Sequence, residues 1–446
     1  MLGAAWRDHP GVGVAARRQH RPALRGRCHA TALVAALLAF AVAVGCSSST
    51  TEDASPTTAV TTTPATSAAP RSTTTAAPAP VPHAVDPGEA QALLDAWREQ
   101  VSAFGALVGM RVPGQPDLLL ASGVDDRNPD SPMPTDGRFF IASITKTFTG
   151  ALVLLLADDG VLSLDDPVEQ WLPGVVPAGD QITLRMLLSH TSGLADLVND
   201  DPGTARSLFL ADLTRTFSPR EAVDYSTALP PVGPPGSQYH YANANYQILG
   251  EVVAAAGHAP LAEQIRTRLT EPLGLRQTSL DDGQLVPGEL HSWFTLDEAR
   301  GDLNAGTFDP TIPRDLDLQD FPRTALISFA GGAGGMRSTV SDLLAWADAL
   351  YGGRVLSTAS TELLTGVPGG TALRGARYGL GVIGFEPEGG EATGAPAFVG
   401  HDGDTIGNRS LLVRTSSGVD IAIHTNVEEV TLKDLVTLVD RLVALT

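Results

Sequence analysis

Residues 139–157 read FFIASITKTFTGALVLLLA, which predicts a long apolar helix from about Ser143 to Ala157. Ser143 and Lys146 stand three positions apart at its start, a spacing that puts both side chains on one helix face. The helix N-terminus adds backbone N–H donors and a partial positive charge beside the serine. A serine becomes a good nucleophile when a neighbouring base takes its proton, and a desolvated lysine can be that base. The stretch therefore predicts a nucleophilic serine with its own base.

Because lysine is scarce in this chain, a serine three residues before a lysine is unlikely to occur by chance. Lys146 and Lys433 are the two lysines among 446 residues, and only Lys146 has a serine three residues earlier. Alone, the pattern is still a weak motif, and the alternative is a helix-capping serine beside a surface lysine.

Two further polar groups follow along the chain. Residues 241–243 read Tyr-Ala-Asn, a phenol suited to proton transfer beside an amide that can orient a substrate or a lysine. The alternative is aromatic core packing, because Tyr239 and Tyr246 lie nearby. Residues 401–403 read His-Asp-Gly after a strand-like run, but His-x-Gly has little value alone and recurs at residues 9–11.

In this order, Ser-x-x-Lys at 143–146, Tyr-x-Asn at 241–243 and His-x-Gly at 401–403 resemble the three boxes of the serine β-lactamase-like, or penicillin-binding, family. That family includes class C β-lactamases, D-Ala-D-Ala carboxypeptidases, D-aminopeptidases and related esterases. Supporting stretches also look similar, and they lie at 139–142, 162–168, 182–194, 235–236 and 331–339. The resemblance covers about residues 90–445, and the combination of motifs is specific although each is weak.

The resemblance implies chemistry for the first two boxes. Ser143 is the nucleophile that becomes acylated, and Lys146 and Tyr241 share the proton transfers of acylation and deacylation. Which of these two is the base stays open. Asn243 is expected to hold the acyl side chain of the substrate and Lys146.

The third box is expected to bind the substrate and its developing charge. His401 supplies the polar group of that box, and Gly403 completes it. The backbone N–H groups of Ser143 and Asp404 form the oxyanion hole, which often supplies the largest single catalytic term. The resemblance implies no cofactor and no metal.

The order of apolar patterns predicts the fold class. Strand-like runs near both ends of the folded part, with helices between them, indicate an α/β (α+β) fold with one antiparallel sheet. Terminal helices flank the sheet, and a mostly helical lobe of about 166–329 is inserted. The predicted strands are 106–112, 118–122, 378–385, 397–399, 410–414 and 419–425, and further helices begin near Asp86, Val340 and Val430.

Composition excludes several classes of function. The formal charge is −20, and an acidic surface repels phosphate, so we expect no nucleic-acid partner. Two cysteines, Cys28 and Cys46, cannot build a disulfide framework or a zinc cage. The chain also has no Gly-x-Ser-x-Gly, His-Glu-x-x-His or phosphate-loop motif. His190 is expected to have a structural hydrogen-bonding role, and His240 is a weaker candidate still.

One departure from the family pattern concerns charge. Family members that bind a substrate carboxylate usually have Thr in the middle of the third box, where this chain has Asp402, followed by Asp404. Like charges repel in a cleft, which favours esters or amides that are neutral or amine-bearing over β-lactams or terminal D-Ala-D-Ala. If 401–404 are extended, alternation could turn Asp402 away from the cleft. A metal site at His401 with the two aspartates is disfavoured, because one short segment does not supply a metal's geometry.

The first 85 residues predict a targeting signal followed by a tether. An apolar run from Ala30 to Gly45 follows an arginine-rich leader and is too short to span a membrane, so we expect a lipoprotein-type signal peptide over 1–45. Cys46 then becomes the lipidated residue, and the alternatives are an ordinary cleaved signal or a single anchor helix. Residues 46–85, rich in Ser, Thr, Ala and Pro, predict a disordered tether. The hydrolase domain is expected over 86–446.

These patterns together predict a lipid-anchored, extracytoplasmic serine hydrolase that acts on esters, amides or cell-wall-type peptides. The expected partners are a small-molecule or peptide acyl substrate and the membrane, and the oligomeric state stays open. The alternative is a non-catalytic protein of the same fold that binds cell-wall peptide or a partner.

Lipidation at Cys46 gives the first testable prediction. We expect Cys46→Ser to move the protein from the membrane pellet to the soluble fraction or the medium, because the acyl anchor is lost. Immunoblots of fractionated cells measure this, and Cys28→Ser is the matched control. Unchanged membrane association of the Cys46 variant would show that lipid on this residue is not the anchor.

Overall fold

The computed structural model describes residues 84–127, 130–281, 283–295, 315–367, 371–373, 376–385 and 396–446. The expected signal peptide, Cys46 and all of the expected tether except Ala84 and Val85 lie outside the described residues. No helix in the described part of the chain has both the length and the hydropathy of a membrane span.

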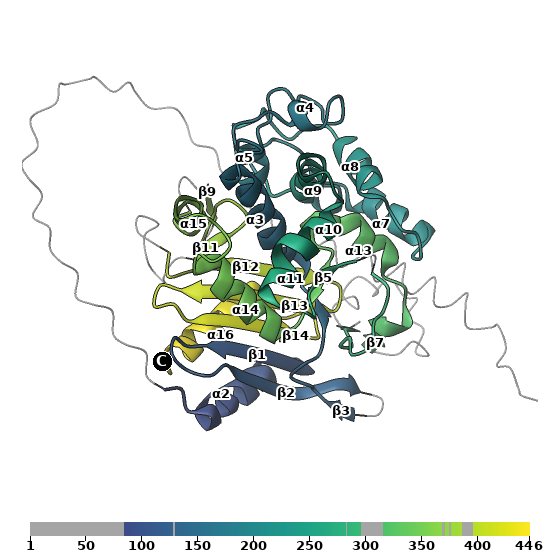
Figure 1. Cartoon of the computed structure of the whole chain (residues 1–446). Coiled ribbons are helices and arrows are strands. Elements are labelled where there is room, and N and C mark those ends of the chain that lie inside the picture. Colours follow the sequence, from purple (N-terminus) through teal and green to yellow (C-terminus); the bar gives the residue numbers. More distant parts are fainter. Residues whose placement is uncertain are drawn as a thin grey trace, which may run out of the picture.

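The described residues form a nine-stranded sheet in which every neighbouring pair is antiparallel. Its order is β3-β2-β1-β14-β13-β12-β11-β10-β9, so β1 pairs with β14 from the far end of the sequence (Figure 1). The predicted fold class is confirmed. The strands are β1 (Gly105–Arg111), β2 (Leu118–Arg127), β3 (Asp130–Pro132), β9 (Thr371–Leu373), β10 (Ala376–Tyr378), β11 (Ile383–Phe385), β12 (Phe398–Thr405), β13 (Asn408–Thr415) and β14 (Asp420–Thr425).

The predicted strand over 378–385 was wrong, because the chain turns within it. β10 ends at Tyr378 and β11 begins at Ile383, and the two strands are antiparallel. Gly381 in the turn has a φ of +90°, which glycine adopts without steric cost. A Cβ at Gly381 would lie 3.0 Å from the Tyr246 hydroxyl, so the turn packs closely against the helical part of the molecule.

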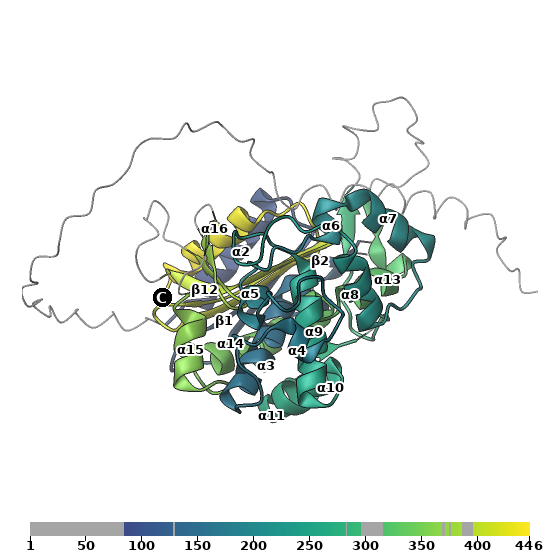
Figure 2. The ribbon, with the colours of Figure 1, turned by 90° about the horizontal axis from the view of Figure 1, so that it is seen from above.

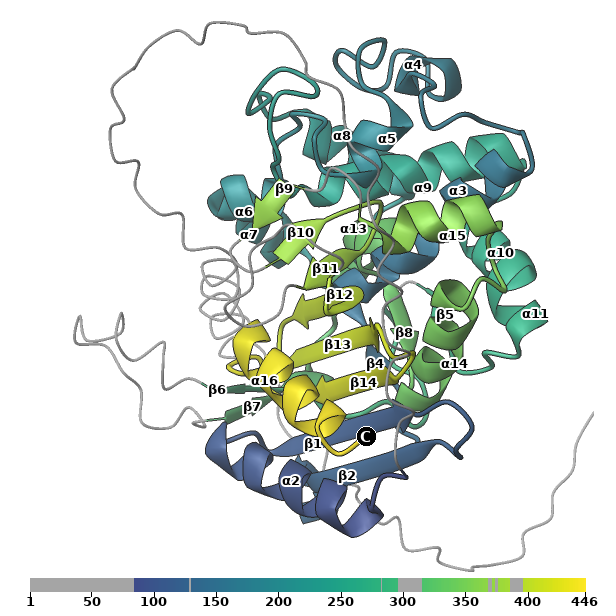
Figure 3. The same cartoon turned by 90° about the vertical axis from the view of Figure 1, so that its left-hand side faces the viewer.

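The terminal helices α2 (Pro87–Gln100) and α16 (Leu432–Val443) pack together and cover one face of the sheet (Figure 3). Along β1, Ala106, Val108 and Met110 belong to the core beneath these helices, whereas Leu107 belongs to the core on the opposite face. This alternation follows from the pleat of a strand, in which successive side chains point to opposite faces.

The opposite face carries helices α14 (Val340–Tyr351) and α3 (Thr145–Asp158), so the sheet lies between two helical layers (Figure 2). Eleven of the 14 residues of α3 are buried, which explains why the sequence of this helix is apolar all round. Trp346 of α14 stacks on Phe148 of α3, with ring centroids 4.0 Å apart. The indole Nε1 donates a hydrogen bond of 2.9 Å to Thr147 Oγ1. The helix that carries Lys146 is thereby fixed from the sheet side.

Most of the remaining helices lie between α3 and α14 in the sequence. The helix α9 (Asn243–Gly257) packs directly against α3. The others in this interval are α4 (Val168–Trp171), α5 (Leu184–Leu188), α6 (Leu197–Asp200), α7 (Pro202–Ala211), α8 (Pro219–Thr227), α10 (Leu261–Ile265), α11 (Glu271–Leu273) and α13 (Thr324–Ala330), and α15 (Thr358–Thr365) follows α14. The expected boundaries of a separate lobe stay a prediction.

Shorter elements connect these layers. They are the small strands β4 (Phe139–Phe140), β5 (Ser279–Leu280), β6 (Trp293–Thr295), β7 (Asp315–Asp317) and β8 (Met336–Ser338), the 3-10 turns η1 (Ala142–Ile144), η3 (Leu318–Asp320) and η4 (Gly331–Ala333), and the π-turn η2 (Arg266–Thr270). β4 and β5 both pair with β8, and β6 pairs with β7.

Candidate active site

Ser143 lies in the 3-10 turn η1, between strand β4 and helix α3. The turn is held in place because Ile141 N donates to Met336 O at 3.0 Å and Ile144 N donates to Ile141 O at 3.1 Å. Ala142 has a φ of +44°, a backbone conformation that L-residues rarely adopt and that costs energy. The surrounding structure therefore imposes the local conformation that precedes Ser143.

The Lys146 ammonium group is fully buried and makes three polar contacts. Its Nζ is 3.0 Å from Ser143 Oγ, 2.9 Å from Asn243 Oδ1 and 2.7 Å from Ala333 O. Burial lowers the pKa of Lys146 to about 7, although the negative charges of Asp196 and Asp402 act in the opposite direction. A neutral amine has two N–H groups, and these can donate hydrogen bonds to Asn243 Oδ1 and Ala333 O. The nitrogen lone pair then faces Ser143 Oγ, as a general base requires.

The hydroxyl of Tyr241 approaches the same serine oxygen and donates to Ser143 Oγ at 2.9 Å. Desolvation raises the pKa of Tyr241 well above its ordinary value, and nearby Asp402 contributes in the same direction. The phenol therefore keeps its proton at neutral pH. The pKa of Lys146 lies near neutrality and that of Tyr241 is raised, and these opposite shifts favour the lysine as base and the tyrosine as acid.

His190 has the structural hydrogen-bonding role that the sequence predicts, and the structure shows that its partners lie in and beside the second box. The imidazole is fully buried, and its Nδ1 accepts hydrogen bonds from Ala242 N at 3.1 Å and Asn245 Nδ2 at 2.9 Å. Its ring stacks on the Tyr241 ring with centroids 4.3 Å apart. Burial and the charge of Lys146 lower the pKa of His190 well below its ordinary value, so the ring is neutral. His240 instead pairs with Asp200 at 2.7 Å in a partly exposed contact.

Sequence reasoning missed Asp196, which is fully buried behind Asn243. Its carboxylate accepts hydrogen bonds from Val198 N at 2.8 Å, from Asn199 N at 2.9 Å and from the backbone N–H of Asn243. Asp196 is also the N-cap of α6. An aspartate just before a helical segment was the available signal, but such a cap predicts a helix start and not a contact with a catalytic box.

The third box lies in β12, where His401 is buried. Its Nε2 is 3.0 Å from the Tyr378 hydroxyl, and its Nδ1 donates to Asp402 O at 2.7 Å. Burial lowers the pKa of His401 to about 4, so the ring is neutral. Both ring nitrogens thus have protein partners, and the expected contact of His401 with substrate stays a prediction. Sequence reasoning missed Tyr378, whose ring also makes an edge contact with His190 at 4.5 Å.

Gly403 allows β12 to approach the residues before Ser143. A Cβ at this position would collide with the carbonyl oxygen of Ile141 and with Ser410 Oγ. Among the described residues, 401–405 pair with β13 alone, because β11 pairs with 398–400. One edge of β12 over residues 401–405 is therefore not paired with another described strand, and β12 packs against η1. Asp404, whose N–H is expected in the oxyanion hole, is one of these residues. That role of the Ser143 and Asp404 N–H groups stays a prediction.

Asp402 in the third box and Asp404 just after it occupy different environments. Residues 401–404 are extended, so Asp402 points away from the face that carries His401, and 21% of its side chain is exposed. Its charge nevertheless acts on Lys146 and Tyr241, because it raises the pKa of both groups. Burial raises the pKa of Asp404 to about 6, and Arg409 pairs with its carboxylate at 3.0 Å.

One group of metal-ligand residue types lies together in the described part of the chain. It consists of Asp126, His291 and Asp317, with His291 Nδ1 and Asp317 Oδ2 2.6 Å apart. None of these residues belongs to the three boxes, and a hydrogen bond between His291 and Asp317 accounts for their contact without a metal.

Known proteins are similar to this chain in sequence and in structure. A family model described as Beta-lactamase matches residues 90–443. The chain is 29% identical over 382 residues to Esterase EstB of Burkholderia gladioli, covering 78% of this chain and 93% of that protein. It is also 29% identical over 238 residues to a penicillin-binding protein of Bacillus subtilis, covering 52% of this chain and 49% of that protein. A D-stereospecific amidohydrolase from Streptomyces sp. has a similar solved structure, with a TM-score of 0.65, 27% identity, and coverage of 79% of this chain and 97% of that one.

The pKa of Lys146 gives a prediction about pH dependence. We expect kcat/KM for a p-nitrophenyl ester to rise as the pH increases through about 7, because the buried amine accepts a proton only after it loses its own. Lys146→Met should lower kcat/KM by roughly 10²- to 10⁴-fold and should remove this rise. Lys433→Met, which changes the other lysine at an exposed position, is the matched control. A wild-type profile that is flat between pH 5.5 and 8.5 would contradict the assignment of Lys146 as base.

Proposed function

Because the chain belongs to the beta-lactamase family, we propose that it hydrolyses esters or amides through a covalent acyl-enzyme on Ser143. One observation carries the proposal. Ser143 Oγ lies 3.0 Å from a buried lysine amine and 2.9 Å from a tyrosine hydroxyl, which are the distances that proton transfer needs.

The first half-reaction forms the acyl-enzyme. Neutral Lys146 takes the proton of Ser143, and Oγ attacks the carbonyl carbon of the substrate. The carbonyl oxygen becomes negatively charged and is stabilised by the N–H groups of Ser143 and Asp404. As the bond to the leaving group breaks, Tyr241 gives that group a proton. The proton held by Lys146 then restores the phenol.

The second half-reaction releases the acyl group. A water molecule attacks the ester on Ser143, the Lys146–Tyr241 pair takes a proton from the water, and the pair returns a proton to Ser143 Oγ. Because both partners contact the same oxygen, the same two groups serve both half-reactions, as microscopic reversibility requires.

The charge of the site supports a neutral or amine-bearing substrate. Asp402 influences Lys146 and Tyr241, so a substrate carboxylate beside them meets a like charge. The relatives include a protein named as an esterase and one named as a D-stereospecific amidohydrolase, which fits the same preference. We therefore assign simple esters and D-amino-acid amides or peptides as the substrate class, ahead of β-lactams.

A non-catalytic binding protein is the weaker alternative. Burying a lysine is costly unless it is paired and hydrogen-bonded. A binding role gives no reason to place that lysine and a desolvated phenol on one serine oxygen. The lysine, phenol and serine together fit proton transfer.

The proposed location rests on the sequence of the leader. The arginine-rich start, the apolar run from Ala30 to Gly45 and Cys46 directly after it support an extracytoplasmic enzyme anchored by lipid.

Labelling with two probes tests the proposed chemistry. We expect a fluorescent fluorophosphonate to label the wild type strongly and a fluorescent penicillin to label it weakly, because the penicillin carries a carboxylate. Ser143→Ala should abolish labelling and should leave the melting temperature nearly unchanged. Ser416→Ala, at an exposed turn serine, should label like the wild type.

The outcomes separate the alternatives. Labelling of the wild type by neither probe would favour the binding protein. Labelling that persists in Ser143→Ala would place the nucleophile elsewhere, and strong penicillin labelling would contradict the preference for uncharged substrates.

A further inference from the structure

Arg337 of strand β8 is a fully buried arginine that belongs to none of the three boxes. Its Nη1 donates to Glu289 Oε2 at 3.0 Å, and its Nη2 donates to Asp281 Oδ1 at 2.8 Å and to Gln284 O at 2.6 Å. Burying a charge is costly unless it is paired and hydrogen-bonded, and the planar guanidinium can bind two carboxylates at once. The segment after β5, which supplies all three partners, therefore fixes the position of Arg337.

Strand β8 connects Arg337 to the chain on both sides of the nucleophile. Phe140, three residues before Ser143, lies directly opposite Arg337 in the antiparallel pairing of β4 with β8. The neighbouring residue of β8, Met336, accepts a hydrogen bond of 3.0 Å from the backbone N–H two residues before Ser143. Met336 N in turn donates to Thr145 Oγ1 at 3.1 Å, in the first turn of α3. A shift of β8 would therefore displace the turn that carries Ser143.

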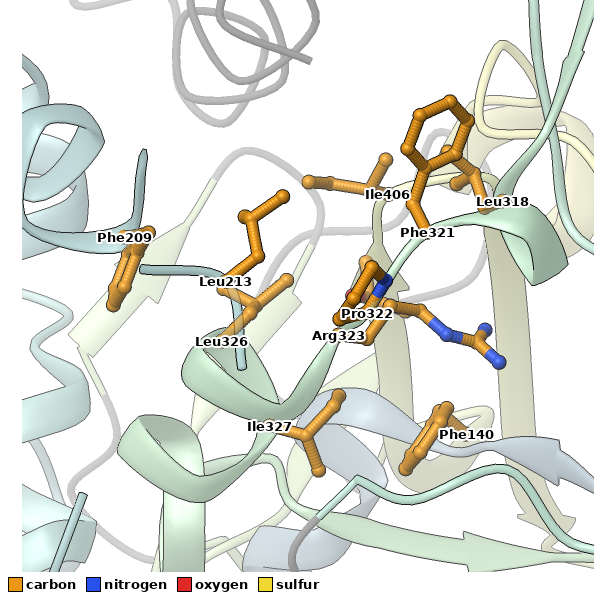
Figure 4. A pocket seen from close by; sticks show the side chains of 11 residues that line it. Phe140, Phe209, Leu213, Leu318, Phe321, Pro322, Arg323, Leu326, Ile327 and Ile406 are labelled. Atoms are coloured by element: carbon orange, nitrogen blue, oxygen red, sulfur yellow. The ribbon is translucent and has the colours of Figure 1, made fainter. Parts of the chain in front are cut away.

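The ring of Phe140 is held by two arginines. The Cζ atom of Arg337 lies 4.6 Å from the ring centroid. Arg323, which Figure 4 shows together with Phe140, has its Cζ atom 5.0 Å from the same centroid and pairs with the same Glu289 carboxylate. A cation is attracted to the face of an aromatic ring, and more strongly where water is excluded. These four residues thus form one buried group in which each member restrains the others.

The base depends on the segment that leads into β8. Ala333 O accepts a hydrogen bond from Lys146 at 2.7 Å, and Ala333 lies four residues before Arg337. Gly334 and Gly335 separate Ala333 from β8. Glycine leaves the backbone free to adopt many conformations, so this segment needs an anchor on its far side. Arg337 supplies one in β8, and it thereby acts on the nucleophile and on the base together.

We propose that Arg337 is a positioning residue for the catalytic serine and lysine: its buried ion pairs hold β8, and β8 sets the distance between the two reacting groups. The inference rests on the proposed function and adds to it a residue outside the three boxes that determines how well they react. Because Arg337 is fully buried, it acts through Phe140 and Met336 and not through contact with the substrate.

The test changes Arg337 and measures turnover per folded molecule. Arg337→Lys keeps the charge but loses the fork that binds two carboxylates, and Arg337→Met loses both. We expect kcat for p-nitrophenyl acetate to fall about tenfold in the lysine variant and about 10²-fold in the methionine variant, with KM nearly unchanged, because a small misplacement of reacting groups costs this much. The midpoint of the rise in activity with pH should also move upward, because a loosened site admits water to Lys146 and burial is what lowers the pKa of this amine.

A matched control separates positioning from general stability. Arg414→Lys weakens the pairing of another arginine of the sheet with a buried carboxylate, that of Asp420, outside the three boxes. This variant should lower the melting temperature and leave kcat and the pH midpoint at the wild-type values. All variants are assayed well below their melting temperatures, and circular dichroism checks that they are folded. If Arg337→Met does not fold, Arg337→Lys and Glu289→Gln, which keeps an oxygen for the guanidinium, decide the question by the same two readouts.

The outcomes separate this inference from the proposed function. Variants of Arg337 that melt at a lower temperature but keep the wild-type kcat per folded molecule and the wild-type pH midpoint would overturn the inference and leave the proposed function intact. A loss of kcat in Arg414→Lys as large as that in Arg337→Lys would overturn it as well. If the wild type hydrolyses no ester at all, the proposed function itself fails.

Discussion

The burial of the Lys146 amine is the constraint on which the rest of this site depends. A lysine at this depth keeps a usable lone pair only because its two fixed acceptors, Asn243 Oδ1 and Ala333 O, leave the third direction to Ser143. Desolvation lowers the pKa of its ammonium group to about 7, so the base works near neutrality. Helix α3 must then be enclosed on every side, which explains an apolar helix between the sheet and the helical layer.

The three boxes meet because each is held by residues outside it. The Asp196 carboxylate accepts a hydrogen bond from the backbone N–H of Asn243. His190 accepts a hydrogen bond from the backbone N–H of Ala242, and its ring stacks on that of Tyr241. Tyr378 is hydrogen-bonded to His401, and its ring contacts that of His190. Gly403 then allows β12 to approach the turn that carries Ser143.

Much of the fold and the centre of the site follow from sequence patterns. The period-two strands, the buried helix after Ser143 and the order of the three boxes predict the sheet, helix α3 and the residues that converge on Ser143 Oγ. Asp196 and Tyr378 were missed because their contacts join segments far apart in the sequence, and a local pattern carries no information about such pairs. The strand over 378–385 was mispredicted because alternation alone does not reveal the turn at Gly381. Tyr378 also supplies the hydrogen-bond partner of His401 Nε2, so the sequence did not reveal that both ring nitrogens of His401 have protein partners.

The most direct test of the central claim is intact-protein mass spectrometry during turnover of a slowly hydrolysed p-nitrophenyl ester, followed by peptide mapping. We predict a mass increase equal to one acyl group, on the peptide that contains Ser143, which disappears as the ester is consumed. Ser143→Ala should show no adduct, and Lys146→Met should accumulate it more slowly than the wild type. Hydrolysis without an adduct, or an acyl group mapped to another residue, would contradict the account.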